Sequence, residues 1–229
     1  MNLERFFMTI DKIERTIREF SEAGKKMFAT SSFQTHSIPL LHIISQIDST
    51  IPVYFINTGF LFAETVAYKN EIADRLQLNI LDTTPVVTKA EQKDRMGRFF
   101  FASDPDHCCF LNKVQPLEPV IAKHDVWING VRADQTDVRK SFKDIEQVRS
   151  NFVRFHPMLD WTKQDIYRYI RENNLPRHPL DMLGYSSIGC EPCTHKPRFD
   201  DDERNSRWFG LKKTECGLNT TLINKEESR

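Results

Sequence analysis

Short apolar stretches alternate with longer segments of helical periodicity, and this alternation constrains the fold more than any other feature of the chain. The stretches at 25–30, 53–56, 79–81 and 126–128 are bounded by glycine or polar residues, as buried strands are. Apolar residues at three- and four-residue steps predict helices over 3–20, 38–47, 62–77 and 161–173. Because strands that alternate with helices are typical of α/β folds, we expect a mostly parallel sheet flanked by helices.

The length of 229 residues suits one large domain. We expect a single domain over 1–229 with an N-terminal helix over 1–24, an α/β core over 25–180 and an irregular, cysteine-bearing segment over 181–229. The 32 basic residues balance the 32 acidic ones, which argues against a nucleic-acid coat or a membrane-surface protein. The start lacks a secretory pattern and no apolar run reaches the ~18 residues of a spanning helix, so we expect a cytoplasmic location.

The first predicted strand runs into a polar loop, SSFQTHS at residues 31–37, which precedes the predicted helix of 38–47. Ligands of open α/β sheets bind beyond the carboxyl ends of the strands, and a helix N-terminus offers free N–H groups to a phosphate. Serine and threonine are also common helix caps, and the loop lacks the glycine and lysine of a Walker-type loop. A phosphate site and an ordinary helix cap are both open interpretations of these residues.

The five cysteines form two close pairs and one isolated residue: Cys108 with Cys109, Cys190 with Cys193, and Cys216. The second pair has the C-x-x-C spacing of a metal knuckle, whereas directly adjacent cysteines rarely ligate one zinc ion. Adjacent thiolates are easier to place on separate irons, so the pattern favours an iron–sulfur cluster. A zinc site, or free buried thiols beside a redox C-x-x-C, are the alternatives.

The isolated Cys216 lies in the stretch KKTECGL at residues 212–218. The two lysines would lower the pKa of its thiol and favour the thiolate, while Glu215 opposes them. A position near the C-terminus suits a nucleophile that must attack and then be presented to a partner. The alternative is an incidental exposed cysteine.

Basic side chains accompany these cysteines in the sequence. Lys113 lies four residues after Cys109, and arginines stand at positions 132, 204 and 207. Arginine forks suit the oxygens of phosphate and sulfate. Any single one of these residues is alternatively a solvated surface charge.

Taken together, these motifs resemble the assimilatory adenylyl-sulfate and phosphoadenylyl-sulfate reductases over about residues 25 to 220. The most specific matches are GYSSIGCEPCT at 184–194, DERNSRW at 202–208 and ECGL at 215–218. Supporting matches are NTGFLFAET at 57–65, the tandem cysteines with Lys113, and WINGVRADQT at 127–136.

The resemblance implies an adenine nucleotide α-hydrolase-like fold, of the kind found in ATP pyrophosphatases, with an irregular C-terminal catalytic segment. The substrate contacts it implies in the modified phosphate loop are Ser31, Ser32, Phe33, Gln34 and Thr35. It also implies a 4Fe-4S cluster with the ligands Cys108, Cys109, Cys190 and Cys193. Members that keep both cysteine pairs mostly use adenylyl sulfate, and members without them usually need the 3'-phosphorylated nucleotide.

The resemblance further implies that Cys216 attacks the sulfur of adenylyl sulfate and carries an S-sulfonate intermediate. A thioredoxin or glutaredoxin-like thiol then releases sulfite. The basic residues implied to face the phosphosulfate are Lys113, Arg132, Arg204 and Arg207. Segment 181–229 would thus bind the cluster and carry the nucleophile.

The chain departs from the family pattern at Asn57, where aspartate is common, at Thr214, where lysine is common, and at Asn219, where histidine is common. These departures bear on nucleotide specificity more than on the chemistry. The chain is also compatible with a homo-oligomer, because the helix over 3–20 could pack on a neighbour as easily as on its own core.

Three other functions stay open at this stage. A phosphoadenylyl-sulfate reductase would release adenosine 3',5'-bisphosphate instead of AMP. A nucleotide-activating ligase or sulfurtransferase of the same fold would carry a Ser-Gly-Gly-x-Asp-Ser loop, which is absent here. A non-catalytic iron–sulfur regulator would have no need of the thiol at Cys216.

Overall fold

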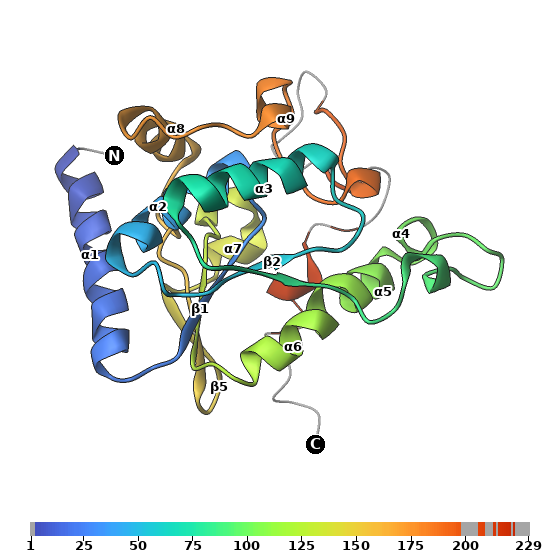
Figure 1. Cartoon of the computed structure of the whole chain (residues 1–229), viewed down its shortest axis with the longest axis horizontal. Coiled ribbons are helices and arrows are strands. Elements are labelled where there is room, and N and C mark those ends of the chain that lie inside the picture. Colours follow the sequence, from blue (N-terminus) through green and yellow to red (C-terminus); the bar gives the residue numbers. More distant parts are fainter. Residues whose placement is uncertain (1–2, 198–205, 209–212, 214, 221, 223–229) are drawn as a thin grey trace.

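A central sheet organises the computed structural model, which describes residues 3–197, 206–208, 213, 215–220 and 222 (Figure 1). The strands of the described chain are β1 (Met27–Ser31), β2 (Val53–Ile56), β3 (Ile80–Thr83), β4 (Val126–Asn129), β5 (Ile145–Arg149) and β6 (Phe152–Phe155). Their order across the sheet is β3-β2-β1-β4-β6-β5, and only the β5–β6 pairing among them is antiparallel. The predicted mostly parallel α/β fold is therefore confirmed.

Helices connect the strands and cover the sheet. They are α1 (Leu3–Glu22), α2 (Ile38–Ile47), α3 (Ala63–Leu76), α4 (Phe100–Ser103), α5 (Pro105–Cys109), α6 (Gln115–Ile121), α7 (Asp137–Lys140), α8 (Lys163–Glu172) and α9 (Pro179–Met182). The four predicted helices correspond to α1, α2, α3 and α8 within a few residues at each end. Sequence reasoning did not predict α4, α5, α6, α7 and α9, nor the strands β5 and β6.

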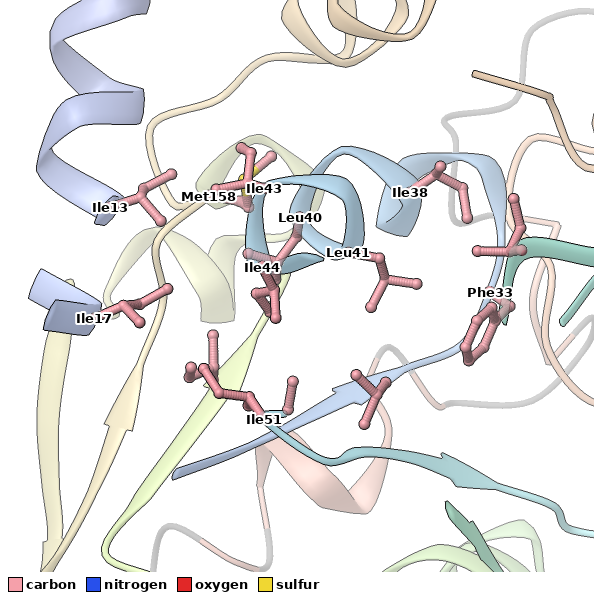
Figure 2. Packing of buried hydrophobic residues seen from close by; sticks show 14 of the residues in the cluster. Ile13, Ile17, Phe33, Ile38, Leu40, Leu41, Ile43, Ile44, Ile51 and Met158 are labelled. Atoms are coloured by element: carbon pink, nitrogen blue, oxygen red, sulfur yellow. The ribbon is translucent and has the colours of Figure 1, made fainter. Parts of the chain in front are cut away.

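The two faces of the sheet carry separate hydrophobic cores, because successive side chains of a strand point to opposite faces. In β1, Met27 and Ala29 join the larger core, which is built on α1, α2 and α8. The intervening Phe28 joins a smaller core with Trp127 and residues of α6. Figure 2 shows the larger core, to which α2 contributes Ile38, Leu40, Leu41, Ile43 and Ile44.

Helix α1 packs on the core of its own chain. Ile13 and Ile17 are each 1% exposed and point toward α2 (Figure 2), and the rings of Phe20 and Phe155 lie 5.9 Å apart. Ile13, Ile17 and Phe20 of the apolar stripe therefore pack within the chain. Within the part of the chain that the structure describes, no helix is both long enough and apolar enough to span a bilayer.

The strand order sets the position of a ligand site. Strand β1 lies between β2 and β4, so the chain winds outward in both directions from β1. In open α/β sheets, ligands bind at such a switch point, beyond the carboxyl ends of the strands. A cavity lies there, lined by Thr30 and Ser31 at the end of β1, by Ile56 at the end of β2 and Thr58 just after it, and by Asn129 at the end of β4.

A buried histidine ties the start of α9 to this edge of the sheet. His178 is fully buried, and its backbone N–H donates to Thr35 Oγ1 at 3.0 Å. Its Nδ1 accepts the backbone N–H of Leu180 at 3.1 Å, so the ring proton sits on Nε2 and faces Thr65 Oγ1 at 3.0 Å. Burial lowers the pKa of His178 from 6.5 to about 4, against the opposing charges of nearby carboxylates.

We expect this histidine to make the free energy of unfolding fall as the pH drops from 6.5 toward 4. Across that window only the unfolded chain protonates His178, so stability is lost by up to about 1.4 kcal/mol per pH unit. The measurement is denaturant unfolding at a series of pH values for the wild type and His178→Asn, whose Oδ1 keeps the acceptor for Leu180. An identical pH slope in the two proteins would rule out this contribution.

Candidate active site

The cavity at the carboxyl edge of the sheet brings basic side chains together with the thiol of Cys216. Its wall includes Lys113, Arg139, Arg154, Arg207 and Cys216. These residues come from regions of the sequence that are far apart, and the fold brings them to one place. Guanidinium and ammonium groups beside a cysteine suit an anionic ligand that the sulfur can reach.

The predicted phosphate loop contributes only part of its length to the cavity. Ser31, Ser32 and Gln34 line it, whereas Phe33 and Thr35 do not. The φ angle of +53° at Phe33 turns its ring into the core, where it is fully buried 5.5 Å from the ring of Phe55. The hydroxyl of Thr35 accepts the His178 N–H, which directs it away from a ligand.

The tandem cysteines lie at the junction of α5 and a π-helical turn over Phe110–Val114. Helix α5 begins at Pro105, a position that suits proline, and the carboxylate of Asp104 caps it by accepting the His107 N–H at 3.0 Å. A π turn widens the helix by one residue and is frequent at functional sites. It carries Lys113 into both the cavity and the neighbouring cysteine pocket.

The second cysteine pair is anchored on the loop that follows β2. The N–H of Glu191 donates to the Phe60 carbonyl at 2.7 Å, and Leu61 forms a bridge with Cys190. The hydroxyl of Thr58 lies 3.3 Å from Cys190 Sγ. These contacts hold the C-x-x-C turn opposite the tandem cysteines.

All four paired cysteines line one small pocket beside the cavity. Its remaining wall residues, apart from Lys113, are Thr58, Phe60, Phe101, Pro105, Asn112 and Pro192. Among the described residues, no three His, Cys, Asp or Glu side chains come close enough together to hold a single metal ion. The four thiols therefore surround a pocket and do not converge on one point.

The electrostatics of this pocket oppose free thiolates. Burial, and then the neighbouring Cys190 and Cys193, raise the pKa of Cys108 to about 11. Burial likewise raises the pKa of Cys193, with a further contribution from Cys190. Asn112 Nδ2, held by Gln92, donates to the Cys108 carbonyl at 2.8 Å and lies 3.5 Å from its Sγ.

The pKa of the isolated Cys216 thiol is shifted in the opposite direction. A hydrogen bond from Cys109 lowers the pKa of Cys216, burial opposes this, and the charge of Lys113 lowers it further. The same hydrogen bond and burial raise the pKa of Cys109. Burial alone would lower the pKa of Lys113, but the surrounding cysteines Cys190, Cys216 and Cys109 raise it overall. Lys113 therefore stays a cation beside the thiolate form of Cys216.

Three arginines were predicted to face the substrate, and their positions differ. Arg207 lies on the cavity wall, where its Nε donates to the Cys193 carbonyl at 3.1 Å. Its guanidinium passes so close to Gly189 that a Cβ there would lie 2.2 Å from it, so this approach requires glycine. Arg132 is not on the cavity wall, and its Nε donates to Asp134 at 2.9 Å. Arg204 lies outside the described residues.

Sequence reasoning missed two arginines that do line the cavity. Arg154 is fully buried in β6, with its guanidinium 4.5 Å from the ring of Trp127, and burial lowers its pKa to about 10. Arg139, 7% exposed, lies in α7. The available signal was an arginine between apolar residues in FVRF at 152–155, since a charge inside a buried strand needs a partner or a ligand.

Comparison with known proteins agrees with this arrangement. The chain matches the model of the phosphoadenosine phosphosulfate reductase domain over residues 26–196. It is 38% identical over 201 residues to a Bacillus cytotoxicus protein named adenosine 5'-phosphosulfate reductase, a match that covers 87% of this chain and 86% of that protein.

Two solved structures share the fold. The phosphoadenylyl-sulfate reductase of Candida auris superimposes with a TM-score of 0.66 at 22% identity, covering 83% of this chain and 96% of that one. The FMN adenylyltransferase of Candida glabrata, in complex with ATP, gives 0.58 at 15% identity, covering 93% and 75%. These likenesses bear out the expected adenine nucleotide α-hydrolase-like fold. The family model spans most of the chain and the curated relative exceeds 30% identity, so the resemblance is confirmed and the chain belongs to the phosphoadenosine phosphosulfate reductase domain family.

Proposed function

We propose that this chain reduces adenylyl sulfate to sulfite and AMP, as an oxidoreductase acting on a sulfur group. The observation that carries the proposal is the thiol of Cys216 in the wall of a cavity that Lys113 and Arg207 also line. The name of the Bacillus relative supports the same reaction. The four retained cysteines favour adenylyl sulfate over its 3'-phosphorylated form.

In the proposed reaction the thiolate of Cys216 attacks the sulfur of the bound phosphosulfate. A sulfur–sulfur bond forms, the sulfur–oxygen bond breaks, and AMP leaves with the electron pair. Lys113, Arg207 and Arg154 offset the repulsion between thiolate and phosphosulfate and stabilise the charge on the leaving phosphate. Ser31, Ser32 and Gln34 bind the nucleotide beside the end of β1.

An external thiol completes the cycle. It attacks the sulfur of Cys216, sulfite leaves with the bonding electrons, and a mixed disulfide remains on the enzyme. A second thiol of the reductant resolves this disulfide, so two thiols supply the two electrons. A thioredoxin or glutaredoxin-like protein, which brings two thiols, suits this role. A cytoplasmic location fits the five cysteines of the chain, because none of them forms a disulfide.

We further propose that the four-cysteine pocket binds a 4Fe-4S cluster through Cys108, Cys109, Cys190 and Cys193. A cubane has its four irons at separate corners, so ligands that surround a pocket fit it better than they fit one tetrahedral ion. When bound, the cluster would join the tandem cysteines to the C-x-x-C turn and add its charge beside Lys113. The steps proposed at Cys216 draw no electrons from the cluster, because the two thiols of the reductant supply them.

The test is sulfite release by anaerobically purified protein, with adenylyl sulfate or its 3'-phosphorylated form and a thioredoxin system. We expect turnover of adenylyl sulfate and an S-sulfonate on Cys216 when the reductant is withheld. Faster turnover of the 3'-phosphorylated nucleotide would instead identify a phosphoadenylyl-sulfate reductase. Nucleotide binding without sulfite would indicate a regulator, and ATP turnover would indicate a ligase or sulfurtransferase; either result would contradict the proposal.

A further inference from the structure

The residue before the nucleophile makes the most extensive set of buried contacts in the described C-terminal segment. The Glu215 side chain is 2% exposed, and its two oxygens accept from Arg139 Nε at 2.9 Å and Nη2 at 3.1 Å. Oε1 also accepts from the Thr136 hydroxyl at 2.8 Å, and Oε2 accepts from Asn219 Nδ2 at 3.1 Å. A buried carboxylate with a bidentate arginine and further donors is a strong and directional tie.

A second arginine of the core holds the same segment from its other end. Arg154 Nη2 donates to Asn219 Oδ1 at 2.9 Å, and Asn219 passes the contact on to Glu215 through its Nδ2. Arg154 lies in β6 and Arg139 in α7, both of which are remote in sequence from the segment. Two fixed cations therefore dock residues 215–219, with Cys216 between the docked side chains.

While residues 215–219 are docked, the guanidinium of Arg139 is held by hydrogen bonds within the protein. Its Nε and Nη2 donate to Glu215, and its Nη1 donates to Gln135. The backbone N–H of Cys216 also points to Glu215 Oε2, at 3.3 Å. The carboxylate of Glu215 thus fixes both the backbone and the location of the neighbouring thiol on the cavity wall.

The two halves of the reaction need opposite arrangements of this segment. Attack on a ligand in the cavity needs Cys216 held on the wall, where the geometry is pre-organised. Reduction of the S-sulfonate needs the same sulfur to meet a thiol on another protein, which is too large to enter the cavity. A set of contacts that holds the segment during attack and breaks before reduction would meet both requirements.

We propose that Glu215 is a positioning residue that locks Cys216 into the cavity for sulfur transfer and whose release from Arg139 exposes the S-sulfonate to the reductant. This inference rests on the proposed function. In this proposal the ion pair between Glu215 and Arg139 determines when the S-sulfonate is exposed, and Glu215 does not bind the substrate.

The experiment compares Glu215→Gln with a matched control, Glu118→Gln. Glu118 forms a partly exposed ion pair with Arg149 at 2.9 Å and does not line the cavity. In anaerobic holoenzyme, we expect iodoacetamide to alkylate Cys216 about tenfold faster in Glu215→Gln, as the loss of a charge-assisted pair implies. Peptide mass spectrometry identifies the alkylated cysteine, and Glu118→Gln should match the wild type.

The rates of the two half-reactions distinguish a positioning role from a merely structural one, because a structural role would not change them in opposite directions. S-sulfonate formation in a single turnover without reductant should slow about tenfold in Glu215→Gln, and sulfite release from preformed S-sulfonate by thioredoxin should be faster than in the wild type. Asn219→Asp keeps the acceptor for Arg154 but sets a second carboxylate against Glu215, and should shift both steps in the same directions.

Wild-type rates for alkylation and for both half-reactions in the two variants would overturn the inference while leaving the proposed function intact. A parallel slowing of both half-reactions would also overturn it, because general loosening of the site has that effect. Failure of the wild type to form any S-sulfonate would instead overturn the proposed function, and the alkylation rates would still report whether Glu215 docks the segment.

Discussion

Replacing Cys216 by serine should abolish sulfite release, with a loss of at least ~10³-fold as expected for removal of a covalent nucleophile. A serine hydroxyl stays protonated near neutral pH, and the charge of Lys113, which lowers the pKa of the thiol, cannot compensate. The measurement is sulfite production from adenylyl sulfate with thioredoxin, together with mass spectrometry of the protein after incubation without reductant. No S-sulfonate should form on the variant.

The control for this variant is ligand binding. Lys113 and Arg207 remain in the cavity wall, so adenylyl sulfate should bind to the variant about as tightly as to the wild type. Sulfite production at the normal rate would exclude Cys216 as the nucleophile. Loss of both binding and activity would show that the substitution disturbs the cavity and would call for a smaller change at this position.

Replacing Cys193 by serine should remove the iron that we propose the four cysteines bind, and should loosen the wall of the substrate cavity. We expect ~4 iron and ~4 sulfide per chain in anaerobically purified wild type, and a colourless variant with little of either. The carbonyl of Cys193 accepts hydrogen bonds from Arg207 Nε and from the Trp208 N–H, both at 3.1 Å. A loosened C-x-x-C turn should therefore also raise the KM for adenylyl sulfate.

Cys216→Ser is the matched control for the metal analysis, since it removes a thiol that does not line the four-cysteine pocket. It should keep the full iron content and the brown colour. One zinc per chain in the wild type, or unchanged iron in Cys193→Ser, would contradict the assignment of the four cysteines. Either result would also reopen the preference between adenylyl sulfate and its 3'-phosphorylated form.

The fold was predictable where the hydrophobic pattern is regular. Strands β1, β2, β3 and β4 and helices α1, α2, α3 and α8 each carry a clear period, and the capping box of Thr162 and Asp165 marks the start of α8. Residues 100–121 were harder to predict, because prolines normally break helices, and here Pro105 and Pro116 stand at the first turns of α5 and α6 while Pro119 lies inside α6. The hairpin of β5 and β6 was missed because its strands carry charged side chains.

The sequence by itself determined the chemical inventory: two cysteine pairs, a separate thiol, a polar loop after the first strand and a family resemblance that the comparisons confirm. These signals are local, since spacing and motif are properties of neighbouring residues. Only the tertiary structure determined which arginines line the cavity. Arg132 turns to the nearby Asp134, whereas Arg139 and Arg154 meet Glu215 and Asn219, partners 76 and 65 residues away. The strength of a charge–charge contact depends on distance and burial in space, and neither is encoded in the local pattern of the chain.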